Sequence, residues 1–184
     1  MTIRYIAFLR AINVGGHNVK MEQLRALFEA MGFSNVETFI ASGNVIFESD
    51  NPEVSGLLEK KIEKELQQAL GYAVATFLRT PAELAELAEY QAFPADSLDA
   101  MQALNVAILA HAPSEAGTQK LMALKTDIDD FQVYKQAIYW LCKKKQSEST
   151  FSNTVLEKAL GQQSTLRGIQ TIRKMAAKYA NSTS

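Results

Sequence analysis

The order of the predicted strands and helices is the feature of this sequence that most restricts how the chain can fold. Strands are predicted at short apolar runs, and helices where apolar residues recur three and four positions apart. The second helix is expected to start at Asn51–Pro52, a capping residue followed by proline. Six segments are predicted in residues 1–80, in the order strand, helix, strand, strand, helix, strand: 3–10, 21–31, 36–40, 45–48, 52–70 and 72–79. This order is the signature of a ferredoxin-like unit.

The same order returns in the second half of the chain. Its segments are a strand at 104–109, a helix from 113, a hairpin of 131–134 and 138–142, a helix from 152 to 161, and a strand at 163–166. One more helix is predicted at 169–179, where apolar residues again have helical spacing. We therefore predict an α+β protein of two ferredoxin-like β-α-β-β-α-β units in tandem, with antiparallel or mixed sheets and an added C-terminal helix.

Three regions follow from this pattern. Residues 1–80 form the first unit, and residues 104–184 form the second unit with the C-terminal helix. Between them, residues 81–103 hold a linking helix and an irregular segment. The linking helix is expected to begin at Thr80–Glu83, because a threonine followed three residues later by glutamate is a capping box.

Composition excludes several classes of function. The 184 residues carry 19 Lys and Arg against 20 Asp and Glu, and this net charge of −1 argues against nucleic acid as a partner. No apolar run approaches the roughly 18–20 residues of a membrane helix, and the N-terminus lacks a signal-peptide pattern, so a cytoplasmic protein is expected. Two histidines and one cysteine, Cys142, make no metal site, and no cofactor is predicted.

Two glycine turns are expected to meet at one edge of the first unit. In the ferredoxin-like topology the first two strands run parallel, so the end of the first strand and the turn after the second lie at the same edge. This places Asn13–Asn18 beside Ser42–Asn44. The pair Gly15-Gly16 matches neither named nucleotide-binding fingerprint. It could nevertheless expose backbone N–H groups to a ligand, as phosphate-binding loops do.

We predict that this edge binds a small anionic or phosphate-bearing ligand. The start of the following helix would attract an anion, and cationic side chains on either side of the turn would add charged donors. The candidate ligand-binding residues are Arg10, Asn13, Gly15, Gly16, His17, Asn18, Lys20, Ser42, Gly43 and Asn44. The alternative is that both segments are ordinary turns, in which the asparagines satisfy the backbone.

The sequence does not allow a catalytic role to be assigned to any residue. His17 could act as a donor or a general base, but no carboxylate partner is assured. Ser42 lacks the GxSxG context of a nucleophile elbow. Whether the protein is an enzyme is therefore left open.

The motifs LRAINVGG at residues 9–16 and SGNVIF at residues 42–47 resemble the bacterial family catalogued as domain of unknown function 1697. The resemblance implies two ferredoxin-like units and no established activity. It maps the motif positions of the family to Arg10, Asn13, Gly15, Gly16, Ser42, Gly43 and Asn44. Near the C-terminus, Gly168 and Ile169 stand where the family has asparagine and tryptophan, and the sequence does not reveal whether this alters the function.

Two alternative functions remain from the sequence. One is a protein-interaction or assembly module, such as a homo-oligomer, because the open faces of two sheets have to be covered. The other is RNA binding, since RNA-recognition modules share this topology and stack bases on aromatic side chains of the first and third strands. Tyr5 or Phe8, together with Phe47, would take that role.

Overall fold

The structure, a computed structural model, describes residues 1–51 and 55–181. Contacts within the chain divide it into two units, one of Met1–Ala85 with Met175–Ser184 and the other of Glu86–Lys174. Each unit contains a four-stranded sheet in which every strand pairing is antiparallel. The predicted α+β fold of two ferredoxin-like units is therefore confirmed. The division into 1–80, 81–103 and 104–184 stays a prediction, and the helix start at Asn51–Pro52 extends outside the described residues.

The first unit has the predicted order of elements. They are β1 (Ile3–Leu9), α1 (Met21–Ala30), β2 (Ser34–Thr38), β3 (Asn44–Ser49), α2 (Ser55–Leu70) and β4 (Thr76–Arg79). The strands lie in the order β2-β3-β1-β4. Because β3 is antiparallel to both of its neighbours, β1 and β2 run parallel, as the topology argument requires.

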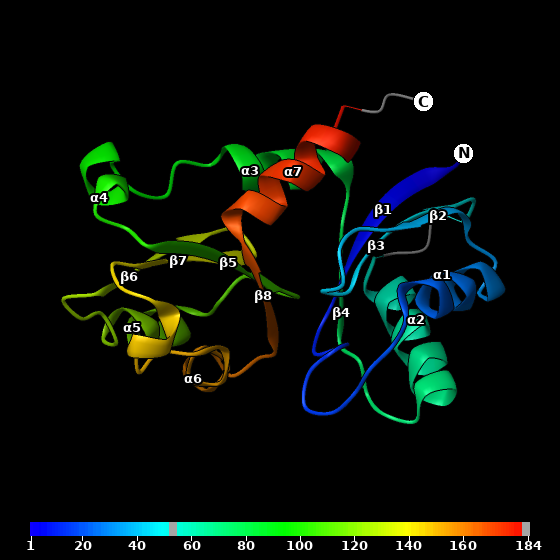
Figure 1. Cartoon of the computed structure of the whole chain (residues 1–184), viewed down its shortest axis with the longest axis horizontal. Coiled ribbons are helices and arrows are strands. Elements are labelled where there is room, and N and C mark those ends of the chain that lie inside the picture. Colours follow the sequence, from blue (N-terminus) through cyan, green and yellow to red (C-terminus); the bar gives the residue numbers. More distant parts are fainter. Residues whose placement is uncertain (52–54, 182–184) are drawn as a thin grey trace. The chain divides into compact units, whose positions relative to one another are not determined.

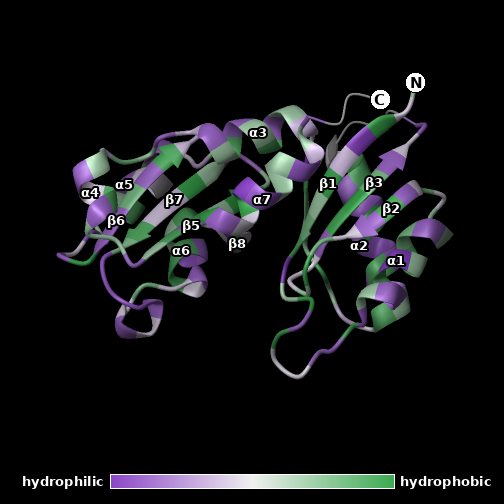
Figure 2. Ribbon diagram, turned by 45° about the horizontal axis from the view of Figure 1, so that its top comes forward, coloured by the Kyte–Doolittle hydropathy of each residue, from purple (hydrophilic) through white to green (hydrophobic). Residues whose placement is uncertain are grey.

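Helices α1 and α2 cover one face of this sheet (Figure 1). Alternate residues of β1, including Tyr5, Ala7 and Leu9, point into the core with Phe28 of α1 and Ile62 of α2. Figure 2 shows hydrophobic colouring along β3, whose residues Val45 and Phe47 belong to this core. This core holds β1 rigidly, so the position where its chain leaves the sheet is fixed.

The second unit repeats the arrangement with the strand order β6-β7-β5-β8. Its sheet and covering helices are β5 (Ala103–Leu109), α5 (Glu115–Met122), β6 (Asp129–Tyr134), β7 (Ala137–Cys142), α6 (Asn153–Leu160) and β8 (Ser164–Gly168). The core between the sheet and its helices includes Phe131, Trp140 and Leu156. Cys142 is wholly buried among these apolar side chains.

Short elements account for the differences from the prediction. Helix α3 (Pro81–Glu89) starts at the predicted capping box, where Thr80 N–H donates to Glu83 at 2.7 Å. The segment expected to be irregular also contains a short helix, α4 (Ala95–Asp99), which has no buried residue and therefore no apolar pattern to reveal it. A 3₁₀ turn at Gln146–Glu148 follows β7.

The C-terminal helix, α7 (Ile169–Tyr179), ends against β2 of the first unit. Lys178 Nζ and the Tyr179 hydroxyl both donate to Oε2 of Glu37, at 3.1 and 3.0 Å. These two hydrogen bonds, from Lys178 first and then from Tyr179, lower the pKa of the Glu37 carboxyl. The carboxylate form of Glu37 therefore stabilises the folded chain.

Glu37→Gln is expected to reduce the loss of stability at low pH. The pKa of Glu37 is lowered from 4.5 on folding, so its contribution is present above that value and is lost as the pH falls through the lower, folded-state pKa. The variant has no carboxyl group at position 37, so protonation there cannot reduce its stability at low pH. Urea unfolding at neutral pH and at about pH 3 measures the difference. Glu65→Gln, at an exposed position of α2, is the control, and equal pH dependence of the two variants would contradict the expectation.

Candidate functional site

The turn after β1 and the turn between β2 and β3 are joined by hydrogen bonds. Asn13 Nδ2 donates to the carbonyl of Ala41 at 2.9 Å, across 28 positions of the chain. The N–H of Leu9 donates to the carbonyl of Gly43 at 2.8 Å. The structure thus brings the two glycine turns together, as expected from the parallel arrangement of β1 and β2.

A third segment, just before β4, holds the turn after β1 in place. The N–H of Arg10 donates to the carbonyl of Ala75 at 2.9 Å, and the Tyr72 hydroxyl donates to the carbonyl of Ile12 at 3.3 Å. The ring of Tyr72 stacks on His17, with ring centroids 3.7 Å apart and planes 20° from parallel. Burial raises the pKa of the Tyr72 hydroxyl, which therefore stays protonated as a donor.

We call residues 10–20, 39–44 and 71–75 together the loop edge. Figure 1 shows the segment after β1 and the segment before β4 leaving the same end of the first sheet. Their sequences contain the cations Arg10 and Lys20 and no aspartate or glutamate. Lys20 is exposed and has no ion-pair partner among the described residues. The loop edge therefore gathers positive charge in a chain whose net charge is −1.

The turn at residues 13–18 closes on itself before the helix begins. The N–H of Val19 donates to Asn13 Oδ1 at 2.7 Å, and the N–H of His17 donates to the carbonyl of Val14 at 3.3 Å. Helix α1 then starts at Met21, after Lys20, so the glycine pair does not form its first turn. The N-terminus of α1, which was expected to attract an anion, therefore follows the glycine turn and is not formed by it.

The three glycines of the loop edge have different physical roles. Gly15 and Gly16 adopt φ angles of 66° and 88°, and a Cβ at either position would meet no atom within 4 Å. Only their left-handed backbone favours glycine, and the backbone is open to an incoming ligand. Gly43 has φ 79°, and a Cβ there would lie 2.6 Å from Cγ2 of Ile12. At this position glycine is required by packing as well as by conformation.

The remaining candidates divide into residues held inside the protein and residues that are exposed. Asn44 is wholly buried, and its Nδ2 donates to the Phe39 carbonyl and to Ser42 Oγ, both at 2.9 Å. The conformation of the loop edge is therefore stabilised by the hydrogen bonds of Asn13 and Asn44 and by the close packing of Gly43. The exposed candidates are Gly15, Gly16, His17, Asn18, Lys20 and Ser42, with Arg10 partly buried.

Tyr72 is the residue of the loop edge that the sequence analysis missed. It bonds Ile12 across 60 positions, and nothing in its local sequence distinguishes it from an ordinary strand tyrosine. Within residues 1–51 and 55–181, no group of three or more His, Cys, Asp or Glu side chains could hold a metal ion. No helix in this part of the chain is long and apolar enough to span a membrane.

Comparison with known proteins places the fold and the family. The chain is similar to the conserved bacterial protein SP0830 from Streptococcus pneumoniae, with 21% identity and a TM-score of 0.73 over 97% of this chain and 98% of that one. At this identity the similarity shows the fold alone. No curated protein matches the chain. The family model described as protein of unknown function (DUF1697) matches residues 1–139, which include both glycine turns. The chain therefore belongs to this family of proteins of unknown function.

Proposed function

We propose that the loop edge binds a small anionic ligand, of the phosphate-bearing class. The observation that carries the proposal is the meeting of three chain segments that contain Arg10, Lys20 and two open glycines but no carboxylate. A charged donor near an anion forms hydrogen bonds about twice as strong as those between neutral groups. None of the three segments contains an acidic residue, so they contribute positive charge alone to the loop edge.

Backbone geometry adds to this charge. Among the described residues, the N–H groups of Gly15, Gly16 and Asn18 have no hydrogen-bond partner, and all three residues are exposed. Successive backbone N–H groups in left-handed and turn conformations form concave anion-binding sites. Ser42 and His17 would orient the bound group through the hydroxyl and the imidazole. The proposal is one of binding, and whether a reaction follows stays open.

A thermal-shift measurement tests the proposal. Inorganic phosphate, adenosine monophosphate and glucose 6-phosphate are added in low-salt buffer that is otherwise free of phosphate. A ligand that binds only the folded chain raises the melting temperature with increasing concentration. At least one of the three compounds is expected to do so, and the rise should shrink at high salt because exposed charges are screened. No rise with any of them would overturn the proposal.

Lys20→Gln is expected to weaken binding of the effective compound about five-fold, because one charge-assisted contact is lost. The variant should fold normally, since Lys20 is exposed and makes no side-chain capping bond. Lys64→Gln on α2 removes the same charge from an exposed position outside the loop edge and should bind like the unchanged protein. If both variants lost the same affinity, the binding would depend on the overall charge of the protein and not on a site at the loop edge.

One observation favours protein interaction as a second candidate function. Val14 and Ile40 are 62% and 53% exposed, and each neighbours a residue of the Asn13–Ala41 hydrogen bond. Exposed aliphatic side chains at one site are typical of a contact with another protein chain. Light scattering coupled to size exclusion discriminates this function, because a Val14→Ser variant would dissociate an assembly formed there. A strict monomer at all concentrations would count against self-assembly.

The RNA-binding alternative finds no such support. Tyr5, Phe8 and Phe47 are 6%, 0% and 0% exposed. Bases stack on aromatic rings that are accessible from solvent. These three side chains contribute to the protein interior in the structure.

A further inference from the structure

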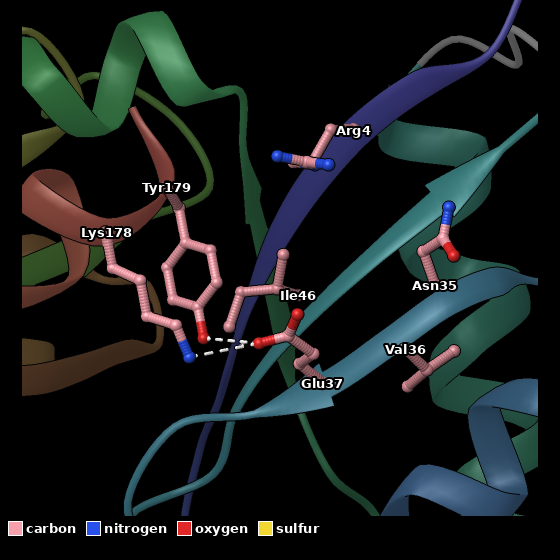
Figure 3. Close-up of a pocket in the computed structure, with 7 residues that line it drawn as sticks. All are labelled: Arg4, Asn35, Val36, Glu37, Ile46, Lys178 and Tyr179. Atoms are coloured by element: carbon pink, nitrogen blue, oxygen red, sulfur yellow. Dashed lines mark hydrogen bonds and ion pairs between the residues drawn. The ribbon is translucent and has the colours of Figure 1, made fainter. Parts of the chain in front are cut away.

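A pocket also lies on the first unit outside the loop edge, although Phe39 of the loop edge contacts its residue Tyr179. The pocket of about 610 Å³ is lined by Arg4 of β1, Ile46 of β3, three residues of β2, and Lys178 and Tyr179 of α7 (Figure 3). Tyr5 and Phe47, the chain neighbours of Arg4 and Ile46, belong to the core under α1 and α2. Because side chains alternate along a strand, Arg4 and Ile46 point to the opposite face, where the pocket opens.

Strand β2 is irregular beside this pocket. The register of β2 against β3 shifts between Ser34 and Glu37, and Asn35 adopts a φ of 48°. Asn35 and Glu37 line the pocket with exposed side chains, whereas Val36 between them is buried and packs in the core under α1 and α2. Bulges of this kind re-aim side chains and are common beside functional sites.

The charges around the pocket cancel in pairs. Arg4 Nη2 lies 2.6 Å from Glu48 Oε1, and Asn35 Nδ2 donates to the other oxygen of Glu48 at 2.6 Å. Lys178 and Tyr179 both donate to Oε2 of Glu37 (Figure 3). Hydrogen bonds from Lys178 and then Tyr179 lower the pKa of Glu37, contacts with Tyr179 and then Glu37 raise the pKa of Lys178, and burial raises the pKa of Tyr179. These contacts favour the carboxylate form of Glu37 and the ammonium form of Lys178.

Unused hydrogen-bonding atoms remain after this pairing. Among the described residues, Glu37 Oε1, Asn35 Oδ1 and Arg4 Nη1 have no hydrogen-bond partner. They provide two acceptors and one donor group around Ile46, whose side chain is 2% exposed and lies across the strand pairing from Glu37. The pocket therefore presents hydrogen-bond acceptors and a donor around a buried aliphatic side chain.

We propose that this pocket binds a neutral polyhydroxylated small molecule of the size of a mono- or disaccharide. Hydroxyl groups can donate to the free oxygens of Glu37 and Asn35 and accept from Arg4 without separating an existing ion pair. A ligand with a net charge would have to compete with those pairs, and burying it without a partner is unfavourable. The volume lies within the range of small-molecule sites, roughly 300–1,000 Å³.

Nuclear magnetic resonance of the full chain tests this site. D-Glucose and maltose are titrated separately, with glycine as a zwitterionic comparison. Saturable shifts are expected at the backbone amides of Asn35, Glu37 and Ile46 with at least one sugar, with a dissociation constant of about 1 mM. No shifts with either sugar, or shifts with glycine alone, would overturn the proposal.

Two variants separate the roles of the pocket residues. Asn35→Gly keeps the left-handed backbone accessible and removes the amide, so sugar affinity should fall about five-fold. Asn18→Gly removes an exposed amide of the loop edge and should leave sugar affinity unchanged. Glu37→Gln leaves the pocket with net positive charge, and inorganic phosphate should then shift the amides of Asn35 and Ile46, which it does not shift in the unchanged protein. Unchanged sugar affinity in Asn35→Gly would contradict the assignment.

Discussion

Gly43→Ala is expected to lower the free energy of unfolding by about 3 kcal/mol, the combined cost of left-handed backbone and overpacking. Gly43 has φ 79°, where a side chain is strained. The added Cβ would lie 2.6 Å from Cγ2 of Ile12 and 3.2 Å from Cβ of Leu9. Leu9 and Ile12 are 0% and 1% exposed, so neither side chain can move into solvent. Urea unfolding followed by circular dichroism measures the loss.

Gly15→Ala is the matched control for this effect. Gly15 has nearly the same left-handed backbone, with φ 66°, but a Cβ there meets nothing within 4 Å. Its expected cost is the conformational part alone, about 1 kcal/mol. Equal losses in the two variants would contradict the conclusion that Gly43 is required by packing between the two turns.

Asn44→Ala is expected to lower the free energy of unfolding by about 2 kcal/mol, because the buried amide that it removes donates two hydrogen bonds. Asn44 is wholly buried, and its Nδ2 donates to the Phe39 carbonyl and to Ser42 Oγ, both at 2.9 Å. Removing the amide leaves the Phe39 carbonyl without this bond and frees the turn that carries Ser42. The same variant should therefore also reduce anion binding at the loop edge.

Asn18→Ala provides the comparison, since Asn18 is exposed and makes no hydrogen bond among the described residues. Its unfolding free energy should stay within about 0.5 kcal/mol of the unchanged protein. If Asn44→Ala changed the free energy of unfolding as little as Asn18→Ala does, the hydrogen bonds of the Asn44 amide would not be needed to hold the turn between β2 and β3.

The order of elements was sufficient to predict the fold and the meeting of the two glycine turns. Strand alternation and helical spacing are local properties, so they can be read along the chain. Once the order is known, the handedness of the β1-α1-β2 crossover leaves few arrangements. The hydrogen bond between Asn13 and Ala41 follows from that topology.

Long-range contacts between individual side chains could not be predicted in the same way. Tyr72 reaches Ile12 across 60 positions, and Tyr179 reaches Glu37 across 142. No local pattern specifies such pairs, because they depend on the exact path of both segments. The shift in β2 at Asn35 is also invisible in sequence, since a bulge adds one residue without changing composition. The pocket beside Glu37 was missed because Lys178 and Tyr179, which complete it, reach Glu37 from the other end of the chain.

The separate roles within the predicted site also needed the structure. In sequence, Asn13, Asn44 and Asn18 are equivalent turn residues. In the structure, Asn13 and Asn44 bond to backbone, whereas Asn18 is exposed. The first two therefore build the loop edge, and the groups left for a ligand are the glycine backbone and the exposed side chains near it.

The most direct test of anion binding at the loop edge is a titration of the full chain with inorganic phosphate, followed by nuclear magnetic resonance. We predict saturable shifts of the backbone amides of Gly15, Gly16 and Lys20, which weaken in Lys20→Gln and persist in Lys64→Gln. Shifts that appear only outside residues 10–20, 39–44 and 71–75, or no saturable shift, would contradict the proposed function.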